Sequence, residues 1–328
     1  RMAEVLNRVI EKAFRGSAPA QINVPRDYWT QVIDIELPPI VRFERQGGGK
    51  EAIENAAKLL SKAKFPVILS GAGVVLGGAI DECKQLAEKL DAPVCNGYQH
   101  NDSFPGSHPL AVGPLGYNGS KAAMELISKA DVVLALGTRL NPFSTLPGYG
   151  IDYWPKKATI IQVDMNPDRI GLTKKVSVGI CGDAKQVAQQ ILDKLSSDAG
   201  NTGREERKNL IHKTKSAWLQ TLSGLDHEED DPGTVWNKEA RERDKDRMSP
   251  RQAWRAIQDA LPQDAIISSD IGNNCAIGNA YPTFEKPRKY LAPGLFGPCG
   301  YGFPAILGAK IGCPDTLSLI HIFRAHET

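Results

Sequence analysis

Two stretches of the chain carry glycine and asparagine in patterns typical of backbone loops that bind an anionic ligand. The first, "DIGNN", ends an apolar run at residues 265–270; Gly272 lets the backbone turn there, and Asn273 and Asn274 offer amide groups. The second, "GLFGPCGYGFPAILGAK" at residues 294–310, is rich in glycine and ends in a small-residue helix. Ligands of open parallel sheets bind beyond the carboxyl ends of strands. We therefore expect the two stretches to flank one crevice for a large ligand with an anionic end and a planar ring.

Each of these residues also has a purely structural interpretation. Because Asn and Gly favour turns, "DIGNN" by itself is equally compatible with a simple turn. Cys299, in the second stretch, is interpreted as a small buried thiol rather than as a nucleophile.

A third candidate is the loop "GYQHNDSFPGSHP", which holds His100, Asp102 and His108. These residue types bind metals, but no further ligand follows at a regular spacing, so we favour a self-bonded turn. If the loop faces the ligand crevice, His100 or Asn101 is expected to contact substrate.

The middle of the chain contains a weaker signal for nucleotide binding. "SGAGVV" at residues 70–75 is a loose relative of a dinucleotide fingerprint and lacks its third spaced glycine. Arg139 follows one predicted strand, and Asp164 ends another at a position that suits a ribose. We interpret these residues as part of a scaffold, with nucleotide binding as the alternative.

The elements that must position these residues alternate between helix and strand. Residues 46–195 repeat amphipathic helices and short, continuously apolar strands, which predicts a doubly wound α/β domain with a parallel sheet. Residues 196–248 are rich in charges of both signs and predict a solvated connector with one or two helices, which Trp218 and Trp236 anchor on a domain. A second α/β unit begins at residue 249, where Ser249, Pro250 and Gln252 form a capping box.

Composition narrows the classes of partner. The 328 residues carry 40 basic and 38 acidic side chains, so the net charge of +2 gives no reason to expect a nucleic acid or an anionic membrane as partner. No run of residues is apolar and long enough for a membrane span. The six cysteines are scattered without a C-x-x-C pair, which favours reduced thiols in a cytoplasm over a zinc site or a disulfide framework.

Together, "DIGNN" and the glycine-rich stretch resemble the diphosphate-binding domain of thiamine-diphosphate-dependent enzymes. "PAQINVPRDYW" resembles the end of their pyrimidine-binding domain, and "FPGSHPL", "LGTRLN" and "QVDMNPDRIG" resemble their central domain. The resemblance covers residues 1–316 in family order. It implies a Rossmann-like central domain, residues 46–195, followed by the first part of a diphosphate-binding domain, residues 249–316.

The resemblance also assigns roles to individual residues. Gly272, Asn273 and Asn274 match the turn that meets the diphosphate, and the segment from Gly297 to Cys299 matches the backbone that hydrogen-bonds the aminopyrimidine. Relatives often have a bulky apolar residue at the position of Cys299, where it holds the cofactor in its bent shape. Since Cys299 is smaller, we expect Pro298, Tyr301 or a partner subunit to supply that support.

Other expected parts lie outside the given sequence. Residues 1–45 resemble the tail of a pyrimidine-binding domain and a linker, so the glutamate that activates the cofactor is expected before residue 1. The Gly-Asp-Gly…Asn motif that binds Mg²⁺ is expected after Asp315, so we assign no catalytic residue and no metal ligand to these 328 residues. We interpret residues 317–328, which contain "LSLIHI", as derived from a sequencing adaptor, with a genuine strand as the alternative.

The activity implied by the resemblance is acyl transfer without redox chemistry, on small anionic substrates that carry a sulfonate or a phosphate. FAD is not expected, and the chain is expected to self-associate because the family binds its cofactor between two subunits. One alternative is an enzyme of the acetolactate-synthase type with FAD in the central domain. The other is a non-catalytic nucleotide-binding module centred on residues 71–164.

Overall fold

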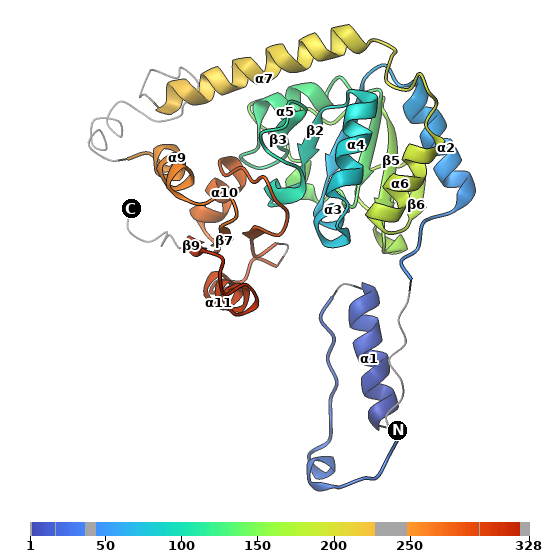
Figure 1. Ribbon diagram of the computed structural model, residues 1–328, viewed down its shortest axis with the longest axis vertical. Helices are drawn as coiled ribbons and strands as arrows, with labels where there is room; N and C mark the ends of the chain where they lie inside the picture. The colour runs from blue at the N-terminus through green and yellow to red at the C-terminus, as the bar shows by residue number, and fades with distance from the viewer. Residues whose placement is uncertain (1, 17, 37–43, 227–247, 295, 322–328) are drawn as a thin grey trace. The chain divides into compact units, whose positions relative to one another are not determined.

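The computed structural model of the protein describes residues 2–16, 18–36, 44–226, 248–294 and 296–321. The chain divides into two units, residues 1–46 and 47–328, and each is described by itself (Figure 1). The first contains α1 (Met2–Gly16) and the 3₁₀ helix η1 (Arg26–Thr30). Residues 19–25, "PAQINVP", are apolar enough for a strand but form none in this unit, which offers them no strand partner among its described residues.

The second unit contains a six-stranded parallel sheet in the order β3-β2-β1-β4-β5-β6. This is the strand order of the Rossmann fold, so the predicted doubly wound α/β domain is confirmed. The strands are β1 (Pro66–Ser70), β2 (Val94–Asn96), β3 (Ala111–Pro114), β4 (Val132–Leu136), β5 (Thr159–Asp164) and β6 (Val178–Cys181).

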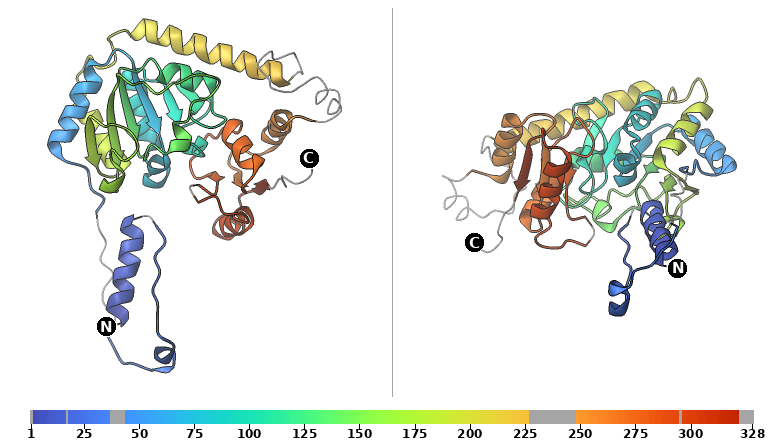
Figure 2. Two further views of the ribbon diagram at one scale, coloured as in Figure 1. Left: turned by 180° about the vertical axis from the view of Figure 1, so that it is seen from behind. Right: turned by 60° about the horizontal axis from the view of Figure 1, so that its bottom comes forward.

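Helices cover both faces of this sheet, which explains why its strands are apolar at successive residues (Figure 2). Ile68 and Leu134 pack on one face, while their neighbours Val67 and Val133 pack on the other. The first face is covered by α2 (Lys50–Lys62), α3 (Ala72–Gly77), α4 (Ile80–Leu90) and α6 (Ala184–Lys194). The second is covered by α5 (Lys121–Ile127) and the start of α7 (Arg204–Asp226). The loops contain the 3₁₀ helices η2 (Asn101–Ser103), η3 (Pro142–Ser144) and η4 (Pro167–Arg169).

The described part of the charged connector before residue 227 contains one long helix, α7, which runs along the central domain toward α9 (Figure 1). Arg207 fixes its start: this side chain is 1% exposed and donates hydrogen bonds to backbone carbonyls that include those of Lys64, Leu90 and Asp91. The predicted packing of Trp218 is confirmed by its edge contact with the ring of Tyr149, 5.7 Å away. Trp236 lies outside the described residues.

The C-terminal part of the second unit has a three-stranded parallel sheet in the order β8-β7-β9. Its elements are α9 (Pro250–Ala260), β7 (Ile266–Ser269), α10 (Asn273–Ala280), β8 (Tyr290–Leu291), α11 (Gly302–Gly312) and β9 (Ser318–His321). The capping box of Ser249 and Gln252 is confirmed, and Trp254 of α9 is buried beside β7. Among the described helices, none combines the length and the apolar character needed to cross a lipid bilayer.

Strand β9 falls within residues 317–328, the segment that we interpret as adaptor-derived. Ser318–His321 pairs with β7, as the alternative of a genuine strand requires, and residues 322–328 lie outside the described part. Pairing depends on local apolar character and not on the source of a segment, so the adaptor origin stays a prediction.

Candidate functional site

The two glycine-containing junctions lie side by side at the carboxyl end of β7. In the first, Gly272 has a φ of 119° and caps α10. In the second, Gly297 and Gly300 have φ values of 57° and 88° just before α11. A Cβ atom added at Gly297 would lie 3.2 Å from Cδ1 of Ile271, and the N–H of Gly300 donates to Oδ1 of Asp270 at 2.9 Å. The structure therefore brings together the two stretches that the sequence places 20 residues or more apart.

The side chains at these junctions leave backbone groups accessible. Gly272, Asn273, Pro298, Cys299 and Gly300 are exposed, and a Cβ atom at Gly300 would meet nothing within 4 Å. The first N–H groups of a helix have no partner within the helix, so the start of α10 suits an anion such as a diphosphate. The N–H groups at the start of α10 fit the anionic end of a ligand, and the open space beside Gly300 fits a planar ring. The binding roles of the individual residues stay predictions.

The exposure of three residues at these junctions bears on their expected roles. Asn274 lies in the first turn of α10 and is fully buried, so its backbone is the part of this residue that remains a candidate for contact with a ligand. Cys299 is exposed, so the interpretation as a buried thiol is wrong. Tyr301 is half-buried at the start of α11, where burial raises the pKa of its phenol and keeps it protonated.

The loop at residues 98–108 connects the central domain to the C-terminal part. The amide of Asn101 is 5% exposed and donates to the backbone carbonyls of Asn279 (3.0 Å) and Pro282 (2.8 Å). Oδ2 of Asp102 accepts hydrogen bonds from the backbone of Lys289 and Tyr290, while burial raises the pKa of this carboxyl. The amide nitrogen of Asn101 is thus engaged in joining two domains, and its predicted contact with substrate stays a prediction.

The two histidines of this loop have different surroundings. Burial, followed by the nearby charge of Arg139, lowers the pKa of His100 to about 4, so its imidazole is neutral at pH 7. Nδ1 of His108 accepts a hydrogen bond from the N–H of Leu110, and its Nε2 lies 3.3 Å from a carboxylate oxygen of Glu88. Because both ring nitrogens of His108 have partners in the protein, the structure favours the turn over the metal site.

Sequence reasoning missed Gln99, which reaches the first turn of α10 beside Tyr98 of the same loop. Its backbone has a left-handed φ of 61°, its N–H donates to Oδ1 of Asn279, and its side-chain amide contacts Sγ of Cys275. Oδ1 and Nδ2 of Asn279 join Gln99 to the backbone of Tyr117. A left-handed φ outside glycine depends on tertiary contacts, so no local sequence signal identifies this residue.

The glycines of "SGAGVV", Gly71 and Gly73, pack closely against the backbone of Gly137. A Cβ atom added at Gly73 would lie 2.6 Å from Cα of Gly137, and the N–H of Gly73 donates to the carbonyl of Gly137 at 2.8 Å. Oδ1 of Asp164 accepts from the backbone of Asn166, and Arg139 is half-buried with its pKa lowered by burial and by the charge of Arg169. These glycines therefore bring two backbone segments together, which agrees with a scaffold.

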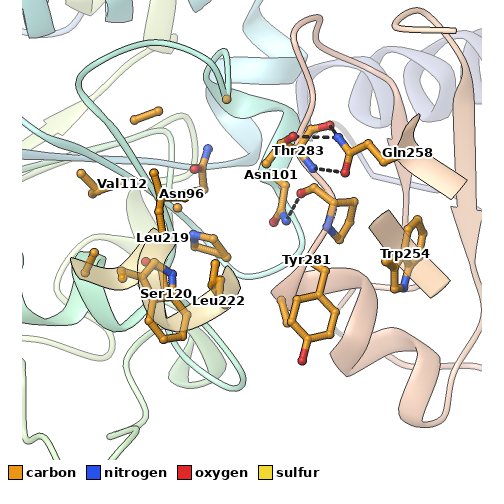
Figure 3. A pocket seen from close by; sticks show the side chains of 18 of the residues that line it. Asn96, Asn101, Val112, Ser120, Leu219, Leu222, Trp254, Gln258, Tyr281 and Thr283 are labelled. Atoms are coloured by element: carbon orange, nitrogen blue, oxygen red, sulfur yellow. Dashed lines mark hydrogen bonds between the residues drawn. The ribbon is translucent and has the colours of Figure 1, made fainter. Parts of the chain in front are cut away.

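A separate pocket of about 440 Å³ lies between the edge of the central domain, α7 and α9 (Figure 3). Val112 and Ser120 lie on the central-domain side, with Trp254 and Tyr281 on the other. Gln258 and Thr283 hydrogen-bond each other in its wall. None of the junction residues at 270–274 or 297–302 lines this pocket, so it is distinct from the candidate site.

Two family models match the chain. Residues 53–191 match the central domain of thiamine pyrophosphate enzymes, and residues 270–322 match their C-terminal TPP binding domain. The first match contains the six-stranded sheet, and the second contains both junctions.

Curated relatives extend the comparison to nearly the whole chain. A probable sulfoacetaldehyde acetyltransferase of Rhizobium meliloti (strain 1021) is 79% identical over 96% of this chain and 53% of the relative. The sulfoacetaldehyde acetyltransferase of Roseovarius nubinhibens is 78% identical over 96% and 52%. A probable acetolactate synthase large subunit of Methanocaldococcus jannaschii is 32% identical over 90% and 48%. The chain thus spans about half the length of the curated relatives it matches.

Proposed function

Because the chain belongs to the thiamine pyrophosphate enzymes, we propose that it forms the central and cofactor-binding parts of a sulfoacetaldehyde acetyltransferase. The observation that carries this proposal is the meeting of the two junctions at the end of β7, supported by the high identity to relatives of that name. The proposed overall reaction converts sulfoacetaldehyde and phosphate to acetyl phosphate and sulfite.

The cofactor is thiamine diphosphate with Mg²⁺. When bound, it supplies a nucleophilic carbon and an electron sink for removal of sulfite and transfer of the acetyl group to phosphate. The chain's own residues bind and orient it. Gly272, Asn273 and Asn274 present the amide groups of the first turn of α10 to the diphosphate, and Gly297, Pro298 and Cys299 present backbone to the aminopyrimidine.

The support that holds the cofactor bent comes from the second junction or from a partner subunit. Cys299 is small and exposed, while Tyr301 is half-buried at the start of α11, which makes Tyr301 and Pro298 the nearest candidates. The proposal assigns the activating glutamate and the Mg²⁺ ligands to no residue of the given sequence. His100 and Asn101 remain the proposed substrate contacts of the loop, with the imidazole of His100 neutral and the amide nitrogen of Asn101 bound to the backbone of Asn279 and Pro282.

Self-association completes the proposed enzyme. Phe303, Leu307 and Ile311 lie four residues apart on α11 and are 63%, 51% and 74% exposed, which leaves an apolar stripe next to the second junction. We propose that a second subunit covers this stripe and thereby lies next to the proposed cofactor-binding junctions. All six cysteines are unpaired, which supports a reducing compartment and therefore a cytoplasmic enzyme.

The central domain acts as a scaffold in this proposal, without FAD. The close contact of Gly73 with Gly137 occupies the turn that a dinucleotide phosphate would approach. For this reason the acetolactate-synthase type and the nucleotide-binding module remain the less favoured functions.

The proposal is tested on the full-length protein. We expect acetyl phosphate and equimolar sulfite to form from sulfoacetaldehyde and phosphate, only when thiamine diphosphate and Mg²⁺ are both present. Stoichiometric flavin in the purified protein, together with acetolactate formation from pyruvate, would overturn it. Binding of a nucleotide by the protein without any dependence on thiamine diphosphate would instead favour the nucleotide-binding module.

A further inference from the structure

Asp270 lies between the two junctions and binds the backbone of both. It directly follows β7, and its side chain is buried. Oδ1 accepts hydrogen bonds from the N–H of Ile271 at 2.7 Å and of Gly300 at 2.9 Å, and Oδ2 accepts from the N–H of Gly302 at 3.1 Å. One carboxylate therefore sets the separation between the turn before α10 and the loop before α11.

Strand β7 also binds the carbonyl group of Gly302. The hydroxyl of Ser268, which is fully buried, donates to the carbonyl oxygen of Gly302 at 3.0 Å. A Cβ atom added at Gly302 would lie 3.3 Å from Cβ of Asp270, which is tighter than most real contacts. Both polar backbone groups of Gly302 are thus bound to the end of β7, and its lack of a side chain permits the close approach.

The ionised form of Asp270 suits this arrangement. A carboxylate only accepts hydrogen bonds, and the three N–H groups that converge on it are all donors. Burial acts to raise the pKa of this carboxyl, but the hydrogen bonds from the backbone outweigh burial and lower the pKa below its usual range. An asparagine of the same size would turn an NH₂ group toward one of these donors.

From these contacts we propose that Asp270 is a positioning residue, whose carboxylate fixes the two junctions at the separation at which both bind thiamine diphosphate. The inference rests on the proposed function. The segment from Gly297 to Cys299 is attached to Asp270 through Gly300 and Gly302, while the proposed diphosphate turn begins at Gly272, two residues after Asp270. Asp270 does not touch the reacting atoms in this role; it aligns the groups that do.

The test measures cofactor affinity in the full-length protein with thiamine diphosphate and Mg²⁺ as the probe. Asp270→Asn is expected to raise the Kd for thiamine diphosphate about 30-fold, or about 2 kcal/mol, because the variant loses hydrogen bonds to a charged acceptor. The value of kcat at saturating cofactor is expected to stay within about threefold of the unmodified enzyme, since excess cofactor restores the bound form. Asp264→Asn is the matched control: it makes the same change at an exposed position before β7, at the other end of the strand, and should leave the Kd unchanged.

If Asp270→Asn does not fold, a second variant can test the proposal instead. Ser268→Ala removes one hydroxyl from the same attachment and is expected to raise the Kd about fivefold, the loss of one ordinary hydrogen bond. The proposal is overturned if both variants bind thiamine diphosphate as Asp264→Asn does, or if the folded variants lose thermal stability without any change in Kd. If the unmodified protein does not bind thiamine diphosphate, the proposed function fails, which is a separate and distinguishable result.

Discussion

The central domain and the C-terminal part both place glycines where a parallel strand turns into a helix, yet the two sets do different things. At the end of β1, Gly73 packs against the backbone of Gly137, with no room for a side chain. At the second junction of the C-terminal part, a Cβ atom on Gly300 would meet nothing within 4 Å. Similar sequence signals thus mark a packed contact in one region and an accessible backbone in the other.

This difference shows that a strand-to-helix turn can need glycine for two separate physical reasons. Where two backbones approach closely, there is no space for a side chain. In an exposed left-handed turn, the φ and ψ angles are unfavourable for any residue with a Cβ atom. A ligand can use the second kind of turn without displacing protein atoms. The same substitution is therefore expected to affect mainly stability in the central domain and mainly cofactor binding at the second junction.

The largest effect is expected for Gly73→Ala in the central domain. The new methyl group would lie 2.6 Å from Cα of Gly137, which is backbone that cannot rotate away. We expect the free energy of unfolding to fall by about 3 kcal/mol, as for overpacked cores. Urea denaturation measures this loss. If the loss is below about 0.5 kcal/mol, the contact is loose and the domain has room for a ligand at that turn.

A smaller effect is expected from pH at His100, in the loop that joins the two regions. Its pKa of about 4 in the folded protein is below the ordinary value of 6.5, so the unfolded chain takes up a proton first as the pH falls. The folded state should therefore lose about 2 kcal/mol between pH 7 and pH 5 through this group. His100→Asn is expected to flatten the pH dependence of urea denaturation by that amount. An unchanged pH dependence in the variant would mean that water reaches the imidazole.

The smallest effect on stability is expected for Gly300→Ala at the second junction. Nothing blocks the methyl group, so the cost is the left-handed backbone, about 1 kcal/mol in the free energy of unfolding. The Kd for thiamine diphosphate should nevertheless rise about tenfold, because the backbone that faces the cofactor must shift. Gly73→Ala serves as the contrasting variant, since its folded fraction should keep the original Kd. If the Kd of Gly300→Ala for thiamine diphosphate equals that of the unmodified protein, this glycine is not part of the cofactor-binding site.

Much of the architecture follows from patterns along the chain. The apolar strands of the central domain predict a sheet covered on both faces, and Ile53, Ala56, Ala57 and Leu60 of α2 are all buried as their helical spacing predicts. The capping box at Ser249 predicts the start of α9. These predictions succeed because each depends on hydrogen bonds and burial within a few turns of the chain.

The surroundings of individual side chains are harder to predict, because distant segments decide them. Cys299 is exposed instead of buried, so that prediction is wrong. The sequence did not predict that Asn101 binds the backbone of Asn279 and Pro282, or that Gln99 adopts a left-handed backbone. For Asn101 and Gln99, the contacts join residues nearly 180 positions apart in the chain. For Cys299, no other element among the described residues covers the side chain.

The sequence by itself determined the doubly wound domain, the glycine-containing junctions and the resemblance that points to thiamine diphosphate. These features depend on periodicity and local turn preferences, which neighbouring residues specify. Only the tertiary structure decided that Asp270 binds both junctions, that Gly73 meets Gly137, and that the loop at 98–108 joins the two domains. The physical reason is that a hydrogen bond or a steric contact depends on where two backbones meet in space, and the order of residues along the chain does not specify that distance.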